Sequence, residues 1–116
     1  MSLTLSQTAH KNCSEILVEG SGLSEVDFEE IHAVVEAEIN NTQPNLILNL
    51  EKVRILNSLG INALIKIFTK CRNSGGDMYI VNISEKINQV LLLTKLNTVL
   101  NIANSTAEAE ENFNLI

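Results

Sequence analysis

The feature that most constrains the fold is a run of five residues in the middle of the chain, Leu46–Leu50 (LILNL), which is apolar except for Asn49. A strand with one face in water alternates apolar and polar residues, whereas a strand covered on both faces is apolar almost throughout. The run therefore predicts a central strand in a sheet that is covered on both sides. Met78–Val81 (MYIV) predicts another strand further along the chain.

Two amphipathic helices are predicted around the central strand, because apolar residues recur there at helical spacing. The apolar stripes are Phe28, Ile31, Val35 and Ile39 in the first helix and Ile61, Leu64, Ile65 and Phe68 in the second. Ser24 and Asp27 form a capping-box-like start for the first helix. Gly75 and Gly76 end the second helix in the way typical of a C-cap.

The two ends of the chain add shorter elements. Leu3–Thr8 and Glu15–Val18, joined by a short polar segment, predict an N-terminal antiparallel hairpin. Further elements are a third helix capped by Ser84, a short strand within Val99–Ile102 and a C-terminal helix that starts at Ser105. Strands separated by helices pair in parallel through right-handed crossovers. We therefore expect one α/β domain over residues 1–116, with a mixed four- to five-stranded sheet, an N-terminal antiparallel hairpin and about four helices.

Charge and composition exclude several classes of partner. The formal charge is −6 and no cluster of Lys or Arg offsets it, which argues against binding to a phosphate backbone. Three Phe, one Tyr and no Trp leave little to stack on bases. No apolar run approaches the roughly 18 residues of a membrane span, and Met1–Cys13 does not have the pattern of a secretion signal. We expect no nucleic-acid partner, no direct membrane insertion and a cytoplasmic location.

Residues for catalysis or metal binding are scarce. His10 and His32 are the only histidines, and neither has a sequence neighbour that suggests a ligand set or a nucleophile–base pair. Cys13 and Cys71 lack the spacing of a metal or redox motif, and Cys71 is expected to be a part-buried, reduced thiol. Most carboxylates of the first helix follow its solvent face. We therefore expect no enzyme, with no catalytic residue, no cofactor and no metal.

Ser58 is the most conspicuous functional candidate. It stands where a helix begins after the central strand, and functional groups of parallel α/β sheets gather at the carboxyl ends of strands. Either Asn57 or Ser58 could instead cap the helix by accepting a hydrogen bond from a free backbone N–H. Spacing alone favours the capping role for Ser58 over a modification site.

A resemblance changes this balance. Leu48–Gly60 (LNLEKVRILNSLG) resembles, without a gap, the signature of the STAS domain, which is named for sulfate transporters and anti-sigma factor antagonists. That signature reads roughly L-D-L-x-x-V-x-x-I/M-D-S-S/T-G-L-G. Asn73–Gly76 is similar to the family's G-G turn, and Ser84–Leu96 resembles its S-P-x-V-x-x-L-x-x-x-G-L helix. The resemblance extends over nearly the whole chain, although the first forty residues share little more than the order of elements.

The resemblance implies a function and a set of site residues. Anti-sigma factor antagonists of the family bind an anti-sigma factor that is a serine kinase, which releases the sigma factor for transcription. Phosphorylation by that kinase ends the binding, and a phosphatase resets the cycle. Ser58 occupies the place of the phosphorylated serine, and the partner-binding surface corresponds to Asn57, Ser58, Leu59, Gly60 and Asn62.

This sequence departs from the family signature at three positions. Asn57 replaces Asp, Leu59 replaces a second small hydroxyl residue, and Asn62 replaces the second Gly of G-L-G. Asn57 has no charge with which to orient a cation or a phosphoryl donor. Asn57 and Leu59 favour an alternative, a STAS subunit of a membrane transport system that docks on a transporter ATPase without being phosphorylated. A small-molecule or nucleotide sensor that uses the same edge of the sheet is a further alternative.

Overall fold

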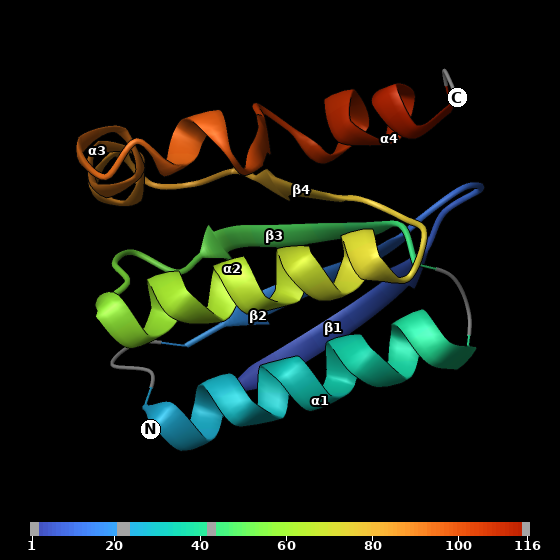
Figure 1. The fold of residues 1–116 in the computed structure, drawn as a ribbon, viewed down its shortest axis with the longest axis horizontal. Coiled ribbons are helices and arrows are strands. Elements are labelled where there is room, and N and C mark those ends of the chain that lie inside the picture. The colour runs from blue at the N-terminus through green and yellow to red at the C-terminus, as the bar shows by residue number, and fades with distance from the viewer. Residues whose placement is uncertain (1–2, 21–23, 42–43, 115–116) are drawn as a thin grey trace.

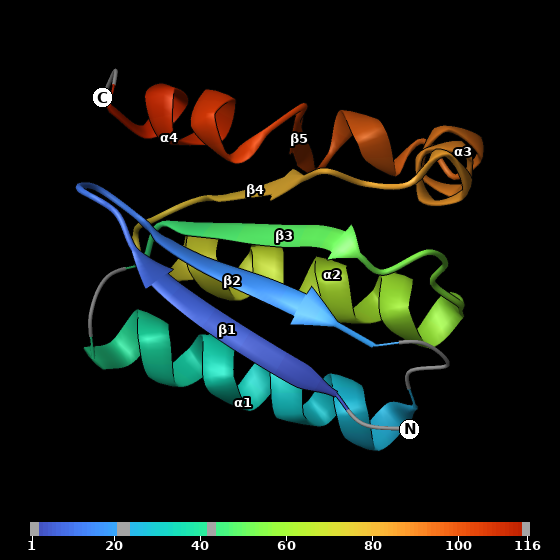
Figure 2. The ribbon, with the colours of Figure 1, turned by 180° about the vertical axis from the view of Figure 1, so that it is seen from behind.

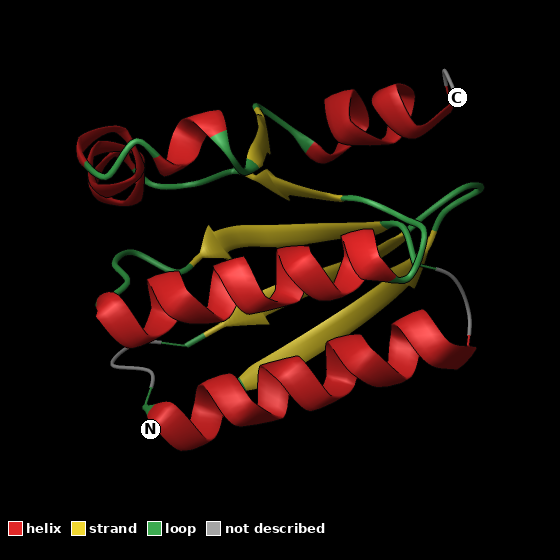
Figure 3. Cartoon of the chain, viewed as in Figure 1, coloured by secondary structure: helices red, strands yellow, loops and turns green. Residues whose placement is uncertain are grey.

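A computed structural model describes residues 3–20, 24–41 and 44–114 of the chain. The strands are β1 (Thr4–Ala9), β2 (Ser14–Glu19), β3 (Leu46–Lys52), β4 (Met78–Val81) and β5 (Asn101–Ala103). The helices are α1 (Glu25–Asn41), α2 (Ser58–Asn73), α3 (Glu85–Leu93) and α4 (Thr106–Asn114), with a 3-10 turn η1 (Leu96–Thr98) between α3 and β5. Strands and helices alternate from β2 onward, as the sequence predicts (Figure 3).

The five strands form one mixed sheet in the order β1-β2-β3-β4-β5. β1 pairs antiparallel with β2, and the three remaining pairs are parallel. β3 is therefore the central strand, as its apolar run predicts. α1 and α2 lie side by side over one face of the sheet (Figure 1), and α4 lies beside β4 and β5 on the other face (Figure 2). The predicted fold class, with its N-terminal hairpin, is confirmed.

The main core lies between the sheet and helices α1 and α2. The sheet contributes alternate side chains, and the helices contribute the stripes at helical spacing. Its buried members include Ile16, Val18, Ile31, Val35, Leu46, Leu48, Leu64, Phe68, Met78 and Ile80. One detail of the prediction is wrong: Ile67 of α2 is buried, whereas Ile65 is only half-buried, because the stripe follows the contact with both the sheet and α1.

A second, smaller core lies on the opposite face, under α4. Ile47 and Val81 contribute from the sheet, and Ala109 and Phe113 contribute from the helix. The Phe113 ring meets Tyr79 edge to face at 5.1 Å between centroids, a favourable aromatic geometry. Because α4 covers this face and α1 and α2 cover the other, β3 is buried on both of its faces.

The turn after α2 requires glycine for two different reasons. Gly75 has a backbone φ of 89°, which residues with a Cβ rarely adopt. At Gly76 an added Cβ would lie 2.2 Å from the carbonyl oxygen of Pro44, so the two chain segments approach too closely for any side chain. Asp77 follows the turn, and its carbonyl accepts a hydrogen bond from Leu46 N–H at 2.9 Å, which joins the turn to the start of β3.

Candidate functional site

The loop after β3 places the start of α2 at the carboxyl edge of the sheet. Asn57 is the N-cap of α2, with extended backbone angles. Its side-chain Oδ1 accepts a hydrogen bond from Gly60 N–H at 3.0 Å, and its carbonyl accepts from Ile61 N–H at 3.0 Å. The capping role that the sequence leaves open between two residues therefore belongs to Asn57, and Ser58 is the first residue of the helix.

Ser58 itself is exposed. Within the described ranges its hydroxyl makes no hydrogen bond, and neither does its backbone N–H or that of Leu59. The first turn of α2 also contains no acidic side chain. The helix start therefore presents a hydroxyl beside two free backbone donors, in the positive field of the helix N-terminus.

Exposed apolar residues precede and follow Ser58 in the chain. Ile55 is 61% exposed and Leu59 is 44% exposed, and both are among the large apolar residues that the fold leaves in water. Asn62 is exposed one turn further along α2. Gly60, in contrast, is buried, because the Phe28 ring and Leu56 pack where its side chain would be. Of the five residues expected to bind a partner, four lie on the surface and Gly60 lies beneath them.

The loop is braced from the neighbouring helix α3. Ser84 Oγ donates to the carbonyl oxygen of Arg54 at 2.5 Å and accepts from Ile87 N–H at 3.1 Å. Ser84 therefore caps α3, as predicted, and at the same time anchors the loop that leads to Ser58. This second contact depends on how two loops meet at the sheet edge, and nothing in the sequence indicates it.

In the described part of the chain no group of three or more His, Cys, Asp or Glu side chains could hold a metal ion. None of its helices is long and apolar enough to cross a bilayer.

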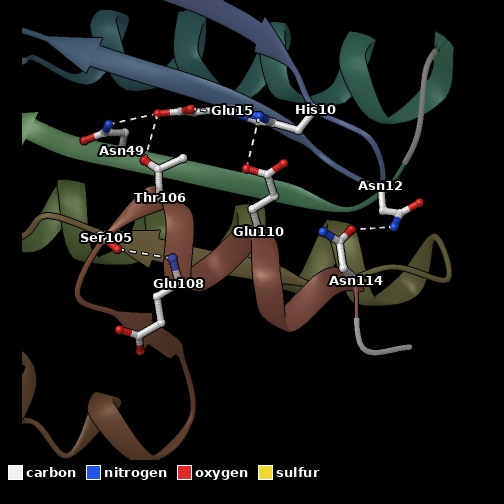
Figure 4. Close-up of polar contacts among 9 residues, drawn as sticks. All are labelled: His10, Asn12, Glu15, Asn49, Ser105, Thr106, Glu108, Glu110 and Asn114. Carbon is white, nitrogen blue, oxygen red and sulfur yellow. Dashed lines mark hydrogen bonds and ion pairs between the residues drawn. The ribbon is translucent and has the colours of Figure 1, made fainter.

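A polar network joins α4 to the second face of the sheet (Figure 4), and the sequence gives no sign of it. Glu15 lies at its centre. Its carboxylate contacts His10 Nε2 at 2.8 Å and accepts hydrogen bonds from Asn49 Nδ2 at 2.9 Å and Thr106 Oγ1 at 3.1 Å. His10 Nδ1 also lies 3.5 Å from a Glu110 carboxylate oxygen. Although no partner for His10 is evident in the sequence, the fold surrounds it with two carboxylates.

The environment of Glu15 changes its pKa. Burial alone would raise the pKa of this carboxyl, but the hydrogen bonds from Asn49, His10 and Thr106 outweigh burial and hold the pKa below its usual value. Glu15 is therefore ionised at neutral pH, and its carboxylate is contacted by side chains of β3, of α4 and of the turn between β1 and β2. These contacts account for a half-buried charge in the sheet as part of the structure, away from Ser58.

Both thiols are buried in the folded chain, and burial raises the pKa of each. Burial, with a smaller effect from Glu110, raises the pKa of Cys13 to about 11. Burial, with a smaller effect from Asp77, raises the pKa of Cys71 to about 12. Cys71 is fully buried and not part-buried as expected. Neither residue has the exposed, low-pKa thiolate that redox chemistry requires.

Comparisons with known proteins give one matching family model and several solved structures of similar fold. A family model described as the STAS domain matches residues 10–109. Solved structures with similar folds include an anti-sigma factor antagonist from Mycobacterium paratuberculosis, at 20% identity over 97% of this chain and 95% of that one, with a TM-score of 0.83. Another is the anti-sigma factor antagonist SpoIIAA in its unphosphorylated form, at 19% identity over 99% and 98% of the two chains, with a TM-score of 0.78.

The phosphorylated form of SpoIIAA, described as a Bacillus cell fate determinant, is also similar, at 19% identity over 96% and 98% of the chains and a TM-score of 0.71. No curated protein matches the sequence significantly.

Proposed function

Because the chain belongs to the STAS domain family, we propose that it is an anti-sigma factor antagonist, a cytoplasmic protein that acts by binding and performs no catalysis itself. Its partner is an anti-sigma factor serine kinase, and binding to that kinase releases a sigma factor for transcription. Phosphorylation of Ser58 ends the binding, and a phosphatase restores it. The observation that carries the proposal is the exposed, unbonded hydroxyl of Ser58 at the start of α2.

The surface around Ser58 supports a role in protein binding. Ile55 and Leu59, which stand on either side of Ser58 in the chain, are exposed and provide apolar area that a partner can remove from water. Asn57 satisfies one helix N–H, so the hydroxyl of Ser58 is not needed to hold the helix together. A hydroxyl that the helix does not need for capping, with exposed apolar residues near it in the chain, is suited to be modified at an interface.

The chemistry proposed for Ser58 is phosphoryl transfer, with the catalytic groups on the kinase. The Oγ atom of Ser58 forms a bond to the γ-phosphorus of ATP, the bond from that phosphorus to the bridging oxygen breaks, and ADP leaves. The hydroxyl proton passes to a base of the kinase. In the reverse half of the cycle, water attacks the phosphoserine in the phosphatase and releases inorganic phosphate.

In the free protein a phosphoryl group on Ser58 is tolerated. It adds about −1.5 to −2 charges, and at a helix N-terminus that charge is favourable by about 0.3–1 kcal/mol. The free N–H groups of Ser58 and Leu59 are the donors available to it. The fold should therefore survive modification.

In the complex the same group is unfavourable. A surface that fits a neutral hydroxyl and two apolar side chains lacks donors for a dianion, and removing an ion from water costs several kcal/mol when it is not matched. Full switching between bound and free states requires about 5.5 kcal/mol, which the burial of an unmatched dianion can supply.

The test is binding of Ser58 variants to purified serine kinases of the anti-sigma factor class from the same genome. We expect Ser58→Asp to fold normally and bind much more weakly, and Ser58→Ala to bind and not be released by ATP. Ser74→Asp is the matched control, because it places the same charge at the exposed far end of α2. Mass spectrometry after incubation with kinase and ATP should find phosphate on Ser58.

If wild type, Ser58→Ala and Ser58→Asp bound the kinase equally with and without ATP, Ser58 would have no switching role. Tight binding to a transporter ATPase, with no phosphate on Ser58, would favour the transport-subunit alternative instead.

A further inference from the structure

The charge of this protein is concentrated on one helix. α1 carries six carboxylates and no Lys or Arg, whereas the eight carboxylates and eight basic side chains in the rest of the sequence balance. The formal charge of −6 therefore belongs to α1 alone. A field of one sign on one side of a protein attracts partners of the opposite sign and orients them as they approach.

Beside this acidic helix lies a groove of about 490 Å³. Each helix lines it with residues spaced three or four positions apart, or adjacent on the same face: Glu25, Phe28, Glu29 and His32 from α1, and Leu59, Asn62, Ala63 and Lys66 from α2. These rows belong to the first halves of the two helices, which run side by side over the same face of the sheet (Figure 1). The groove therefore opens next to Ser58, which precedes Leu59 in the chain.

The close contact between Phe28 and Gly60 fixes how the two helices meet at this end. An added Cβ on Gly60 would lie 2.9 Å from the Phe28 ring, so the ring occupies the space that any larger residue would need. Phe28 is consequently half-buried against α2 and forms part of the groove lining. The apolar part of the groove is thus built on packed side chains, which keeps its shape defined without a ligand.

The ionisable side chains of the groove have no partners within the described part of the chain. Glu25, Glu29, His32 and Lys66 make neither an ion pair nor a side-chain hydrogen bond there. The two carboxylates stand on the α1 side and the single lysine stands on the α2 side. The groove therefore combines an apolar centre with unpaired negative charge along one wall.

We propose that this groove receives a segment of the kinase partner that carries an apolar side chain and, next to it, a Lys or Arg facing α1. This inference rests on the proposed function and extends the contact surface from the start of α2 to the neighbouring helix. Two residues of the proposed Ser58 surface, Leu59 and Asn62, also line the groove, so the two parts form one continuous surface. The unpaired carboxylates of α1 select the basic character of the segment, and Phe28, Leu59 and Ala63 select the apolar side chain.

A matched pair of charge reversals tests the proposal. Glu29 lines the groove, whereas its neighbour Glu30 is also exposed on α1 and does not line it. Glu29→Lys and Glu30→Lys change the net charge by the same amount, so long-range steering should slow association about equally in both. Direct contact should add a faster dissociation only for Glu29→Lys. We expect Glu29→Lys to weaken binding to the kinase by about tenfold or more relative to Glu30→Lys.

A variant that should change the affinity in the opposite direction completes the test. Lys66 lies in the groove and repels the proposed basic group, so Lys66→Gln should tighten binding, by about threefold, instead of weakening it. Far-ultraviolet circular dichroism and thermal unfolding check that the exposed variants retain the fold. Binding and dissociation rates are measured by surface plasmon resonance against the purified kinase at two salt concentrations.

The groove and the proposed function fail in distinguishable ways. If wild type binds the kinase and Ser58→Asp does not, but Glu29→Lys and Glu30→Lys dissociate at the same rate, the groove is not part of the interface and the proposed function stands. Weaker binding of Lys66→Gln would also overturn the assignment of a basic segment. If wild type binds no kinase of this class, both the proposed function and the groove proposal are wrong.

Discussion

The roles of two adjacent residues at the start of α2 can be separated by measuring stability. Asn57 Oδ1 accepts a hydrogen bond from Gly60 N–H at 3.0 Å, whereas the Ser58 hydroxyl is exposed and makes no bond in the described part of the chain. Replacing an N-cap Asn by Ala costs about 1 kcal/mol. We expect Asn57→Ala to lose about that amount of unfolding free energy, and Ser58→Ala to stay within about 0.5 kcal/mol of wild type.

A third substitution strengthens the comparison. Asn57→Asp keeps the acceptor oxygen and adds a negative charge in a first turn that contains no acidic residue, which is worth about 0.3–1 kcal/mol. The three variants should therefore rank in stability as Asn57→Asp, then wild type with Ser58→Ala, then Asn57→Ala.

Urea unfolding at pH 7 measures these differences directly, provided that the slope of free energy against urea stays constant. The melting temperature of Asn57→Ala should fall by about 4 °C for a domain of this size. If Ser58→Ala were as destabilised as Asn57→Ala, the serine would be the functional cap, and its availability for modification would be in doubt.

Two further predictions concern buried polar groups. The side chain of Ser14 is buried, at 1% exposure, and its hydroxyl has no hydrogen-bond partner in the described protein. Because an unsatisfied buried group costs about 1–3 kcal/mol, Ser14→Ala should unfold at the same or a higher temperature. A clear drop in the melting temperature would reveal a partner for the hydroxyl. Glu15 has a lowered pKa, so its ionised form stabilises the fold above the unfolded pKa near 4.5 and this contribution is lost as the pH falls through the lower, folded pKa. Glu15→Gln should flatten the loss of stability measured by urea unfolding from pH 6 down to pH 3, and equal slopes for both proteins would contradict the role given to this carboxylate.

Local patterns were sufficient to predict most of the elements. The apolar run of β3 and the stripes of α1 and α2 follow from burial at a fixed period, and no distant contact is needed to interpret them. The short strand predicted within Val99–Ile102 is shifted toward the C-terminus: η1 occupies Leu96–Thr98, and β5 covers Asn101–Ala103. Weak periodicity near the C-terminus left that boundary undetermined in the sequence.

The site illustrates what sequence patterns do not contain. They placed Ser58 at a helix start, but only the geometry of the loop distinguishes Asn57 as the cap. Contacts between distant segments were also out of reach, such as Thr106 against Glu15, 91 residues apart. The groove depends on the way Phe28 packs against Gly60, which is a property of two helices together and not of either one alone.

The two cysteines lie in different layers of the molecule, so each layer contains one natural thiol whose labelling can report its opening. Cys13 belongs to the cluster under α4, and Cys71 belongs to the main core between the sheet and the two long helices. A thiol reacts with a disulfide reagent only when it is accessible and ionised, so each labelling rate reports how often its own layer opens. A transient departure of α4 alone would label Cys13 and spare Cys71, whereas global unfolding would label both at one rate. The timing of local and global opening can thus be measured on the natural sequence, without introducing any further cysteine.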